Sequence, residues 1–298
     1  MKNVLSKLLT LLIIIVILGT GIALEITLNR YRLEKTNRLE LSNEVKHEKD
    51  GRTEIDWKKL KERNPDVIAW ISLEDSEINY PVLKGKDNEY YLHRDIDGNY
   101  LYDGCIYVDA FNPAPFRSAN TVIYGHKMRS GAMFAGLKNY ADKDFWKDHP
   151  VINLYTPSAS YDLKVVAYTR DDAYSDLYRT IDENVTAEDL KDYEDIYFTK
   201  KNFLDLVREK AMIISDETLS EADTYVTLST CVYSEGDERQ QIICTVNEKK
   251  TDDISKSPTN EAGKGPTWLN KFLIAQIVVA ALMISIIAGM VKPRRKSK

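Results

Sequence analysis

The sequence predicts a mainly β domain, built on a closed or nearly closed eight-stranded barrel with helices before and between its strands. Eight runs rich in Val, Ile, Tyr and Thr are separated by turn residues. Closing them into a barrel removes the exposed edges that an open sheet would leave. About 220 to 245 residues remain between two apolar ends, which is enough for one large domain with a sizeable core.

The predicted elements follow one another along the chain. An amphipathic helix comes first, at residues 56–63, and Asn64-Pro65 ends it. The strand-like runs occupy residues 67–73, 78–83, 105–108, 121–124, 151–155, 161–168, 225–230 and 241–246. Further helical stretches are expected at residues 88–93, 132–140, 186–193 and 201–211. The stretch between Tyr168 and Tyr225 is therefore a long, partly helical insertion, a kind of connection that is often functional.

Both ends of the chain carry apolar segments. The run from Leu8 to Leu24 has 17 residues, near the lower limit for a spanning helix. Because no clear A-x-A site follows it, an uncleaved anchor is preferred over a cleaved signal peptide. The run from Phe272 to Val291 has 20 residues and no charge, and the basic tail after it places the C-terminus in the cytoplasm. Two spans would put residues 25–271 outside the cell.

These segments predict five parts. The Glu/Lys/Arg-rich second part is expected to be a stalk, because it has too little apolar surface for a core element. The parts are an N-terminal membrane anchor (1–28), a stalk or linker (29–54), a folded barrel domain (55–248), a flexible tether (249–267), and a C-terminal span with a basic cytoplasmic tail (268–298). The two apolar ends carry +2 and +5 of the net charge of −5, which leaves −12 for the middle. An acidic middle argues against nucleic-acid binding and fits a soluble surface domain.

One thiol has the setting of a nucleophile. Cys231 follows the alternating run 225–230, so it lies at the end of a rigid, half-buried strand. A lone cysteine is more often a buried core residue, and a reactive one needs a cation nearby to stabilise its thiolate. Cys105 and Cys244 lie in β-like runs and are either buried hydrophobes or a pair. Cys231 is the unpaired thiol in either case.

Two further residues complete a candidate constellation. Of the four histidines, His126 is by elimination the best general acid or base, because it follows a strand-like run and a flexible Gly125. A histidine in this position can also be an ordinary solvated residue. Arg239 precedes the last strand-like run. It either stabilises a developing oxyanion or forms a weak solvated ion pair with Asp237 or Glu238.

Together these residues resemble a known family. The order Tyr124-Gly125-His126, then Thr227–Cys231, then Arg239 at the start of the next strand is similar to that of the sortases, the cysteine transpeptidases of Gram-positive cell surfaces. The resemblance covers about residues 55–248. Segments 64–71, 87–92, 120–137 and 170–224 are similar to class B sortases in particular. The C-terminal span is more typical of class C, the pilus-assembling sortases.

The resemblance implies a sortase β-barrel and a set of site residues. Cys231 would be the nucleophile, His126 the general acid, and Arg239 the oxyanion- or substrate-binding group. Substrate contacts are expected for Asn88, Leu92, Ser229 and the backbone N–H near Val232. This chemistry requires no metal and no cofactor.

The expected function is therefore that of a membrane-anchored, extracytoplasmic cysteine transpeptidase. It would cleave an LPXTG-like or NPXTN-like sorting signal in surface proteins or pilins through a thioacyl-enzyme. The acyl group would pass to an amine of a peptidoglycan cross-bridge or to a pilin lysine. The alternative is a non-enzymatic, membrane-anchored β-barrel binding protein in which Cys231 is inert. A papain-like hydrolase fits poorly, because its Cys precedes its His, and here His126 precedes Cys231.

Overall fold

The computed structural model describes residues 2–49, 52–181, 198–231 and 238–249. The chain forms two compact units, and the second runs from Leu41 to Gly263. Four sequence predictions lie outside the described residues: the helix at 186–193, the backbone near Val232, the tether beyond residue 249, and the C-terminal span with its tail.

The first unit contains most of a long helix, α1 (Lys2–Val45). Among the described residues, its segment Ser6–Asn29 is the one helix that is long and apolar enough to cross a membrane, with a mean hydropathy of 2.6. The hydroxyls of Thr10 and Thr27 donate to backbone carbonyls four residues earlier, which satisfies these polar groups within an apolar segment. A helix at this position fits a membrane anchor or a signal sequence.

The end of α1 belongs to the second unit and is part of its core. Leu41 and Val45 are buried in a cluster with Leu60 and Trp70. The Asn79 side chain donates a hydrogen bond of 2.8 Å to the Ser42 hydroxyl, which is also buried. The prediction that residues 29–54 contain no core element is therefore wrong. Leu41 and Val45 lie one helical turn apart, so they form one buried stripe, whereas Leu39 is exposed.

Helix α2 (Trp57–Arg63) confirms the first predicted helix. It begins where the Asp56 carboxylate accepts a hydrogen bond from the backbone N–H of Lys59 at 3.0 Å, an N-cap that satisfies one otherwise unpaired donor. It ends at Asn64, since the following proline disfavours a helical conformation of the residue before it.

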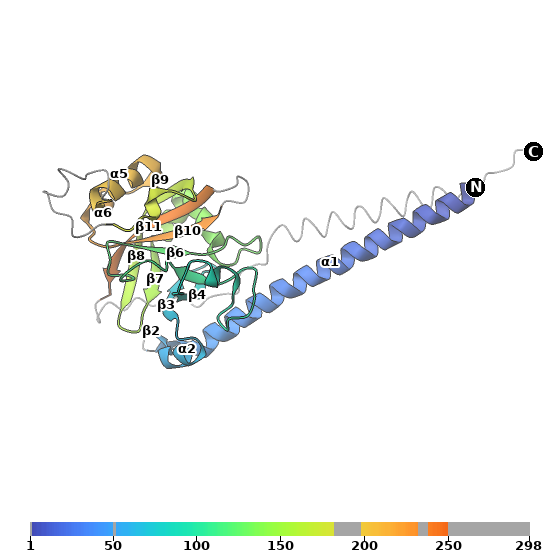
Figure 1. Ribbon diagram of the computed structural model, residues 1–298, viewed down its shortest axis with the longest axis horizontal. Coiled ribbons are helices and arrows are strands. Elements are labelled where there is room, and N and C mark those ends of the chain that lie inside the picture. The colour runs from blue at the N-terminus through green and yellow to red at the C-terminus, as the bar shows by residue number, and fades with distance from the viewer. Residues whose placement is uncertain (1, 50–51, 182–197, 232–237, 250–298) are drawn as a thin grey trace, which may run out of the picture. The chain divides into compact units, whose positions relative to one another are not determined.

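All eight predicted strands are present and form a closed barrel (Figure 1). They are β3 (Val67–Ser72), β4 (Asn79–Leu83), β5 (Ile106–Val108), β6 (Asn120–Tyr124), β7 (Val151–Tyr155), β8 (Ser160–Asp172), β10 (Tyr225–Cys231) and β11 (Glu238–Glu248). Their order is β11-β10-β6-β5-β4-β3-β7-β8, and β8 pairs with β11 to close the sheet. Strand β9 (Ala211–Ile214) extends the sheet beside β8. Strands β1 (Lys46–Lys49) and β2 (Arg52–Ile55) form a separate antiparallel pair.

Helical segments connect the strands. They are the short 3₁₀ helices η1 (Tyr90–His93), η2 (Phe134–Ala141) and η3 (Asp176–Tyr178), and the α-helices α3 (Lys143–Asp148), α5 (Lys200–Lys210) and α6 (Asp216–Glu221). The sequence predicted η1, η2 and α5 within a few residues of these bounds. Helices α5 and α6 lie in the predicted insertion between β8 and β10 (Figure 1).

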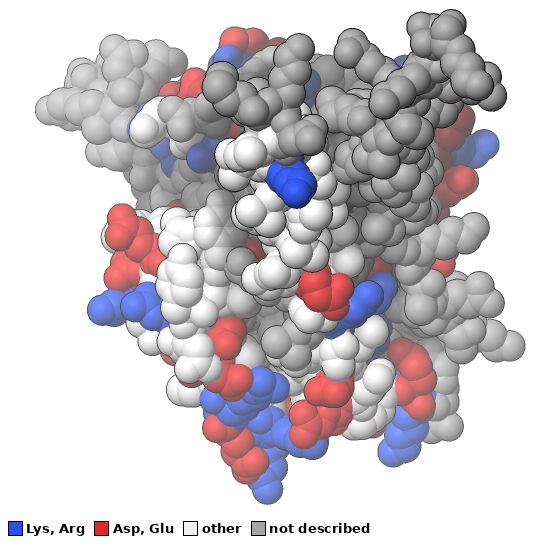
Figure 2. Space-filling model, turned by 90° about the vertical axis from the view of Figure 1, so that its right-hand side faces the viewer, with Lys and Arg blue, Asp and Glu red and all other residues white. Residues whose placement is uncertain are grey.

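Strand alternation divides the core into an inner and an outer part. On β11, Ile242 and Cys244 belong to the main barrel cluster, and Ile243 between them packs with Phe203 and Val207 of α5. Successive side chains of a strand point to opposite faces, so β11 supports both the barrel interior and the docked insertion. On the face drawn in Figure 2, described acidic and basic side chains are intermixed, as expected for a solvated surface.

Candidate active site

The central strand of the candidate site is β10, whose last residue is Cys231. On one side β10 runs parallel to β6, with Ser229 opposite Tyr124. On its other side β10 runs antiparallel to β11, with Cys231 opposite Arg239. The strand order β11-β10-β6 thus places the backbone of Cys231 between the strand that carries Arg239 and the strand that leads into His126. Three sequence-predicted residues far apart in the chain meet at one end of three neighbouring strands.

His126 is held directly after the end of β6. The backbone N–H of Gly125 donates to the carbonyl of Ser229 at 3.1 Å, which continues the pairing with β10 past the strand end. The carbonyl of His126 accepts from the backbone N–H of Phe134 at 2.9 Å. A Cβ at position 125 would lie 2.6 Å from the Phe134 ring, so only glycine allows this ring to cover the chain there. The backbone of His126 is therefore anchored on both sides.

The surroundings of His126 make its protonated form a stronger acid than a free imidazolium. Burial lowers its pKa, and the nearby charges of His93 and Arg239 lower the pKa further. A hydrogen bond with the backbone of Tyr102 opposes this shift. An acid with a lowered pKa gives up its proton more readily, which suits proton donation to a departing amine.

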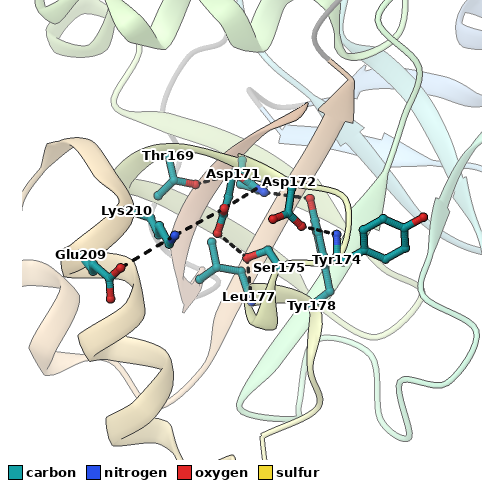
Figure 3. A network of polar contacts seen from close by, with 10 residues as sticks. Thr169, Asp171, Asp172, Tyr174, Ser175, Leu177, Tyr178, Glu209 and Lys210 are labelled. Atoms are coloured by element: carbon teal, nitrogen blue, oxygen red, sulfur yellow. Dashed lines mark hydrogen bonds and ion pairs between the residues drawn. The ribbon is translucent and has the colours of Figure 1, made fainter. Parts of the chain in front are cut away.

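Arg239 faces the site from β11. Its Nη1 donates to the carbonyl of Glu238 at 3.2 Å. Asp171 on β8 is its cross-strand neighbour, but the Asp171 carboxylate accepts a hydrogen bond from Ser175 and lies 3.6 Å from Lys210 Nζ, as Figure 3 shows. Among the described residues, Arg239 forms no ion pair with Asp171. The Asp171 carboxylate thus contacts residues of the insertion. The Arg239 guanidinium keeps N–H donors for an anionic group.

Ser229 has a partner that the sequence did not predict. Its hydroxyl lies 2.8 Å from the Tyr178 hydroxyl, which also accepts from Gln241 Nε2 at 2.8 Å. The Gln241 carbonyl oxygen in turn accepts from the buried Thr169 hydroxyl. This network joins η3, β8, β10 and β11 beside the nucleophile strand. No spacing in the sequence indicates it, because Tyr178 lies 51 residues from Ser229.

Asn88 and Leu92 have structural contacts of their own. The Asn88 amide accepts from the backbone N–H of Ala110 at 2.7 Å and donates to the Asp109 carboxylate at 3.0 Å. Asp109 also accepts from the Tyr124 hydroxyl at 3.0 Å, next to the site. Leu92 packs at the edge of the cluster that contains Tyr91 and Trp70. Their contact with a substrate peptide stays a prediction.

The other two cysteines are separate from the site and from each other. Cys105 packs beside one hydrophobic cluster, Cys244 belongs to another, and both are free thiols. The disulfide between them that the sequence left open is therefore absent. Burial raises the pKa of Cys105 to about 12 and raises that of Cys244 as well. Neither residue has the reactive character of a low-pKa thiol.

Comparisons with known proteins agree with this barrel. Residues 71–247 match the Sortase domain family. Sortase B of Listeria monocytogenes is 31% identical over 235 residues, which cover 77% of this chain and 91% of that protein. Sortase B of Staphylococcus aureus is 29% identical over 253 residues, which cover 83% and 98%. The structure of a Staphylococcus aureus sortase B–substrate complex matches with a TM-score of 0.57 and 27% identity, covering 76% of this chain and 98% of that one.

The fold and the matches together define a class of enzyme, the cysteine transpeptidases that work outside the cytoplasm. The chain belongs to the sortase family, and its relatives are class B members of that family. The predicted eight-stranded sortase barrel is confirmed, and the alternative of a non-enzymatic binding protein is not favoured.

Proposed function

We propose that this sortase is a membrane-anchored enzyme that uses Cys231, His126 and Arg239 to cut a sorting signal and transfer the acyl part to an amine. The observation that carries the proposal is the placement of Cys231 at the end of β10, with Arg239 opposite it on β11 and His126 directly beyond the paired end of β6. The sortase B–substrate complex of Staphylococcus aureus supports a peptide substrate.

The proposed reaction has two halves. The thiolate of Cys231 attacks the scissile carbonyl carbon, and the oxyanion that forms is stabilised by Arg239 and the backbone N–H near Val232. The protonated ring of His126 gives its proton to the departing amine, the C–N bond breaks, and a thioester remains. An incoming amine then attacks the thioester, neutral His126 takes its proton, and the Cys231 thiolate leaves. The substrate contacts would come from Asn88, Leu92 and Ser229.

We propose the following organisation around the membrane. The N-terminal helix acts as an uncleaved anchor, because Ser6–Asn29 is long and apolar enough to span and no clear cleavage site follows it. Residues 268–298 provide a second span with a cytoplasmic tail, residues 249–267 a tether, and the folded part begins at Leu41 within the expected stalk. The partners are surface proteins or pilins with a C-terminal sorting signal, and the acceptor is a cell-wall cross-bridge amine or a pilin lysine.

The test is capture of the acyl-enzyme. The full chain is incubated with LPXTG-like and NPXTN-like peptides, and its intact mass is measured. A thioester adduct is expected on the wild type and on Cys105→Ala, and its absence is expected on Cys231→Ala. Turnover by Cys231→Ala would remove the nucleophile assignment.

Thiol labelling separates the enzyme from an inert binding protein. A brief treatment of the native chain with iodoacetamide at neutral pH should label Cys231 and spare Cys105 and Cys244, whose pKa values are raised by burial. Peptide mapping identifies the labelled residue, and the unfolded chain, in which all three thiols react, is the control. If Cys231 is labelled no faster than Cys105, the result would support a binding protein in which Cys231 is inert.

A further inference from the structure

A second histidine lies beside His126, at the end of η1. The ring centroids of His93 and His126 are 5.8 Å apart, with the two planes at 66°. The ring of Tyr102 stacks on His93 at 5.8 Å and lies 6.2 Å from His126. The sequence offered His93 only as part of a helix-like stretch, and the proposed reaction assigns it no role.

One backbone carbonyl connects the two imidazoles. His93 Nδ1 lies 3.0 Å from the carbonyl oxygen of Tyr102. A carbonyl can only accept, so Nδ1 of His93 carries the hydrogen and donates it. His126 also has a hydrogen bond with the backbone of Tyr102. The Tyr102 carbonyl therefore restricts the rotation of the His93 ring and sets its tautomer, and the bond with the same backbone residue restricts the rotation of the His126 ring.

The backbone around Tyr102 is held firmly enough to act as a fixed acceptor. The N–H of Leu101 donates to the carbonyl of His93 at 3.1 Å, and the N–H of Cys105 donates to the carbonyl of Tyr91 at 2.9 Å. Gly104 has a φ of +58°, and a Cβ there would lie 2.4 Å from the carbonyl of Leu92. A glycine at this position lets the loop approach η1 closely.

We propose that His93 is a positioning residue for the transpeptidation: together with the Tyr102 carbonyl, it holds the ring of His126 in the orientation and tautomer that proton transfer to the leaving amine requires. This inference rests on the assignment of His126 as the general acid. When the proton donor is misplaced, the chemical step slows although substrate binding is unchanged. Substitution of His93 should therefore lower kcat and leave KM nearly unchanged.

The charges around His126 come from several elements. Those that act on its pKa are His93 on η1 and Arg239 on β11, and Lys127, the next residue in the chain, donates from its Nζ to Gln240 at 3.0 Å. Positive charge on His93 opposes protonation of His126. Removal of this charge should therefore raise the pKa of His126 and move the part of the pH–rate profile that depends on this ring toward higher pH.

The experiment uses two substitutions that separate the hydrogen bond from the charge. His93→Gln keeps an N–H donor for the Tyr102 carbonyl and removes the charge, and His93→Phe keeps a flat ring and removes the donor. Kinetics are measured on the full chain across pH. His93→Phe should lower kcat about tenfold or more, with KM changed by less than about twofold. His93→Gln should retain most of kcat and show the shifted pH profile.

Histidine-ring NMR supplies an independent readout. In full-length Cys231→Ala with labelled imidazoles, the chain has only four histidines to assign, and His93→Gln should raise the pKa of His126. His149→Gln is the matched control, because His149 Nδ1 also contacts a backbone carbonyl, that of Phe145 at 3.1 Å, and stacks on the Phe145 ring. It should leave the His126 pKa and kcat unchanged.

The outcomes distinguish this inference from the reaction itself. If Cys231→Ala and His126→Ala are inactive and both His93 variants keep wild-type kcat, pH profile and His126 pKa, the positioning role is overturned and the proposed function stands. If His126→Ala retains full activity, the proposed function fails first. A kcat loss in His93→Phe with rescue in His93→Gln supports the inference.

Discussion

Arg239 illustrates how much a single residue depends on its cross-strand neighbours. We expect Arg239→Ala to lower kcat/KM by about 10²-fold or more, since removal of a group that stabilises an oxyanion has this size of effect. Arg239→Lys should recover part of the loss, because it keeps a charge without the planar pair of donors. The measurement is peptide transfer kinetics, with Arg208→Ala on α5 as a control that keeps activity. Wild-type rates in Arg239→Ala would show that Arg239 is an ordinary solvated residue with no part in the reaction.

Gly125 is a residue whose absent side chain matters. We expect Gly125→Ala to destabilise the fold by about 1 to 3 kcal/mol, because the new methyl group would overlap the Phe134 ring and force a shift next to His126. Activity should fall with stability. Gly136→Ala is the matched control, since its Cβ would meet only Ile78 at an ordinary 3.7 Å. Thermal unfolding of both variants checks this, and equal melting temperatures would contradict it.

At the scale of elements, the insertion is held to the barrel by α5. Phe203 and Val207 are fully buried, and the Phe203 ring lies 5.4 Å from that of Tyr225 at the start of β10. We expect Phe203→Ala to cost about 3 to 5 kcal/mol of unfolding free energy through the cavity it leaves. Lys201→Ala, on the exposed side of the same helix, should cost little. Urea unfolding measures both, and an unchanged midpoint for Phe203→Ala would show that the insertion is not docked.

Local patterns explain which elements the sequence could predict. The eight barrel strands were found because each has its own apolar run, whereas β1 and β2 have charged sequences and pair only with each other. Strand β9 was not predicted: it follows directly after α5, and its first residue, Ala211, was assigned to the predicted helix at 201–211. The cysteine, histidine and arginine could be named as candidates because each marks a strand end. The contact between His93 and His126 was not, because a loop closes it.

For the whole molecule, the start of the folded unit can be tested by truncation. Fragments that begin at residues 31, 38 and 55 and end at residue 263 are compared by thermal unfolding. The first two should unfold alike, because both retain Leu41 and Val45. The third should lose about 3 kcal/mol or more, since each of these side chains contributes about 1.5 kcal/mol or more when fully buried. Identical melting temperatures for all three would restrict the folded part to residues after 54.

Strand order has a consequence for the design of covalent inhibitors. Because β10 lies between β6 and β11, an electrophile bound to Cys231 would have the proposed proton donor His126 on one flank and the Arg239 guanidinium on the other, each about 5 Å away in strand spacing. These flanks are not interchangeable. A chiral warhead should react quickly only when its oxygen faces β11 and its departing group faces β6, so two enantiomers should inactivate the enzyme at very different rates.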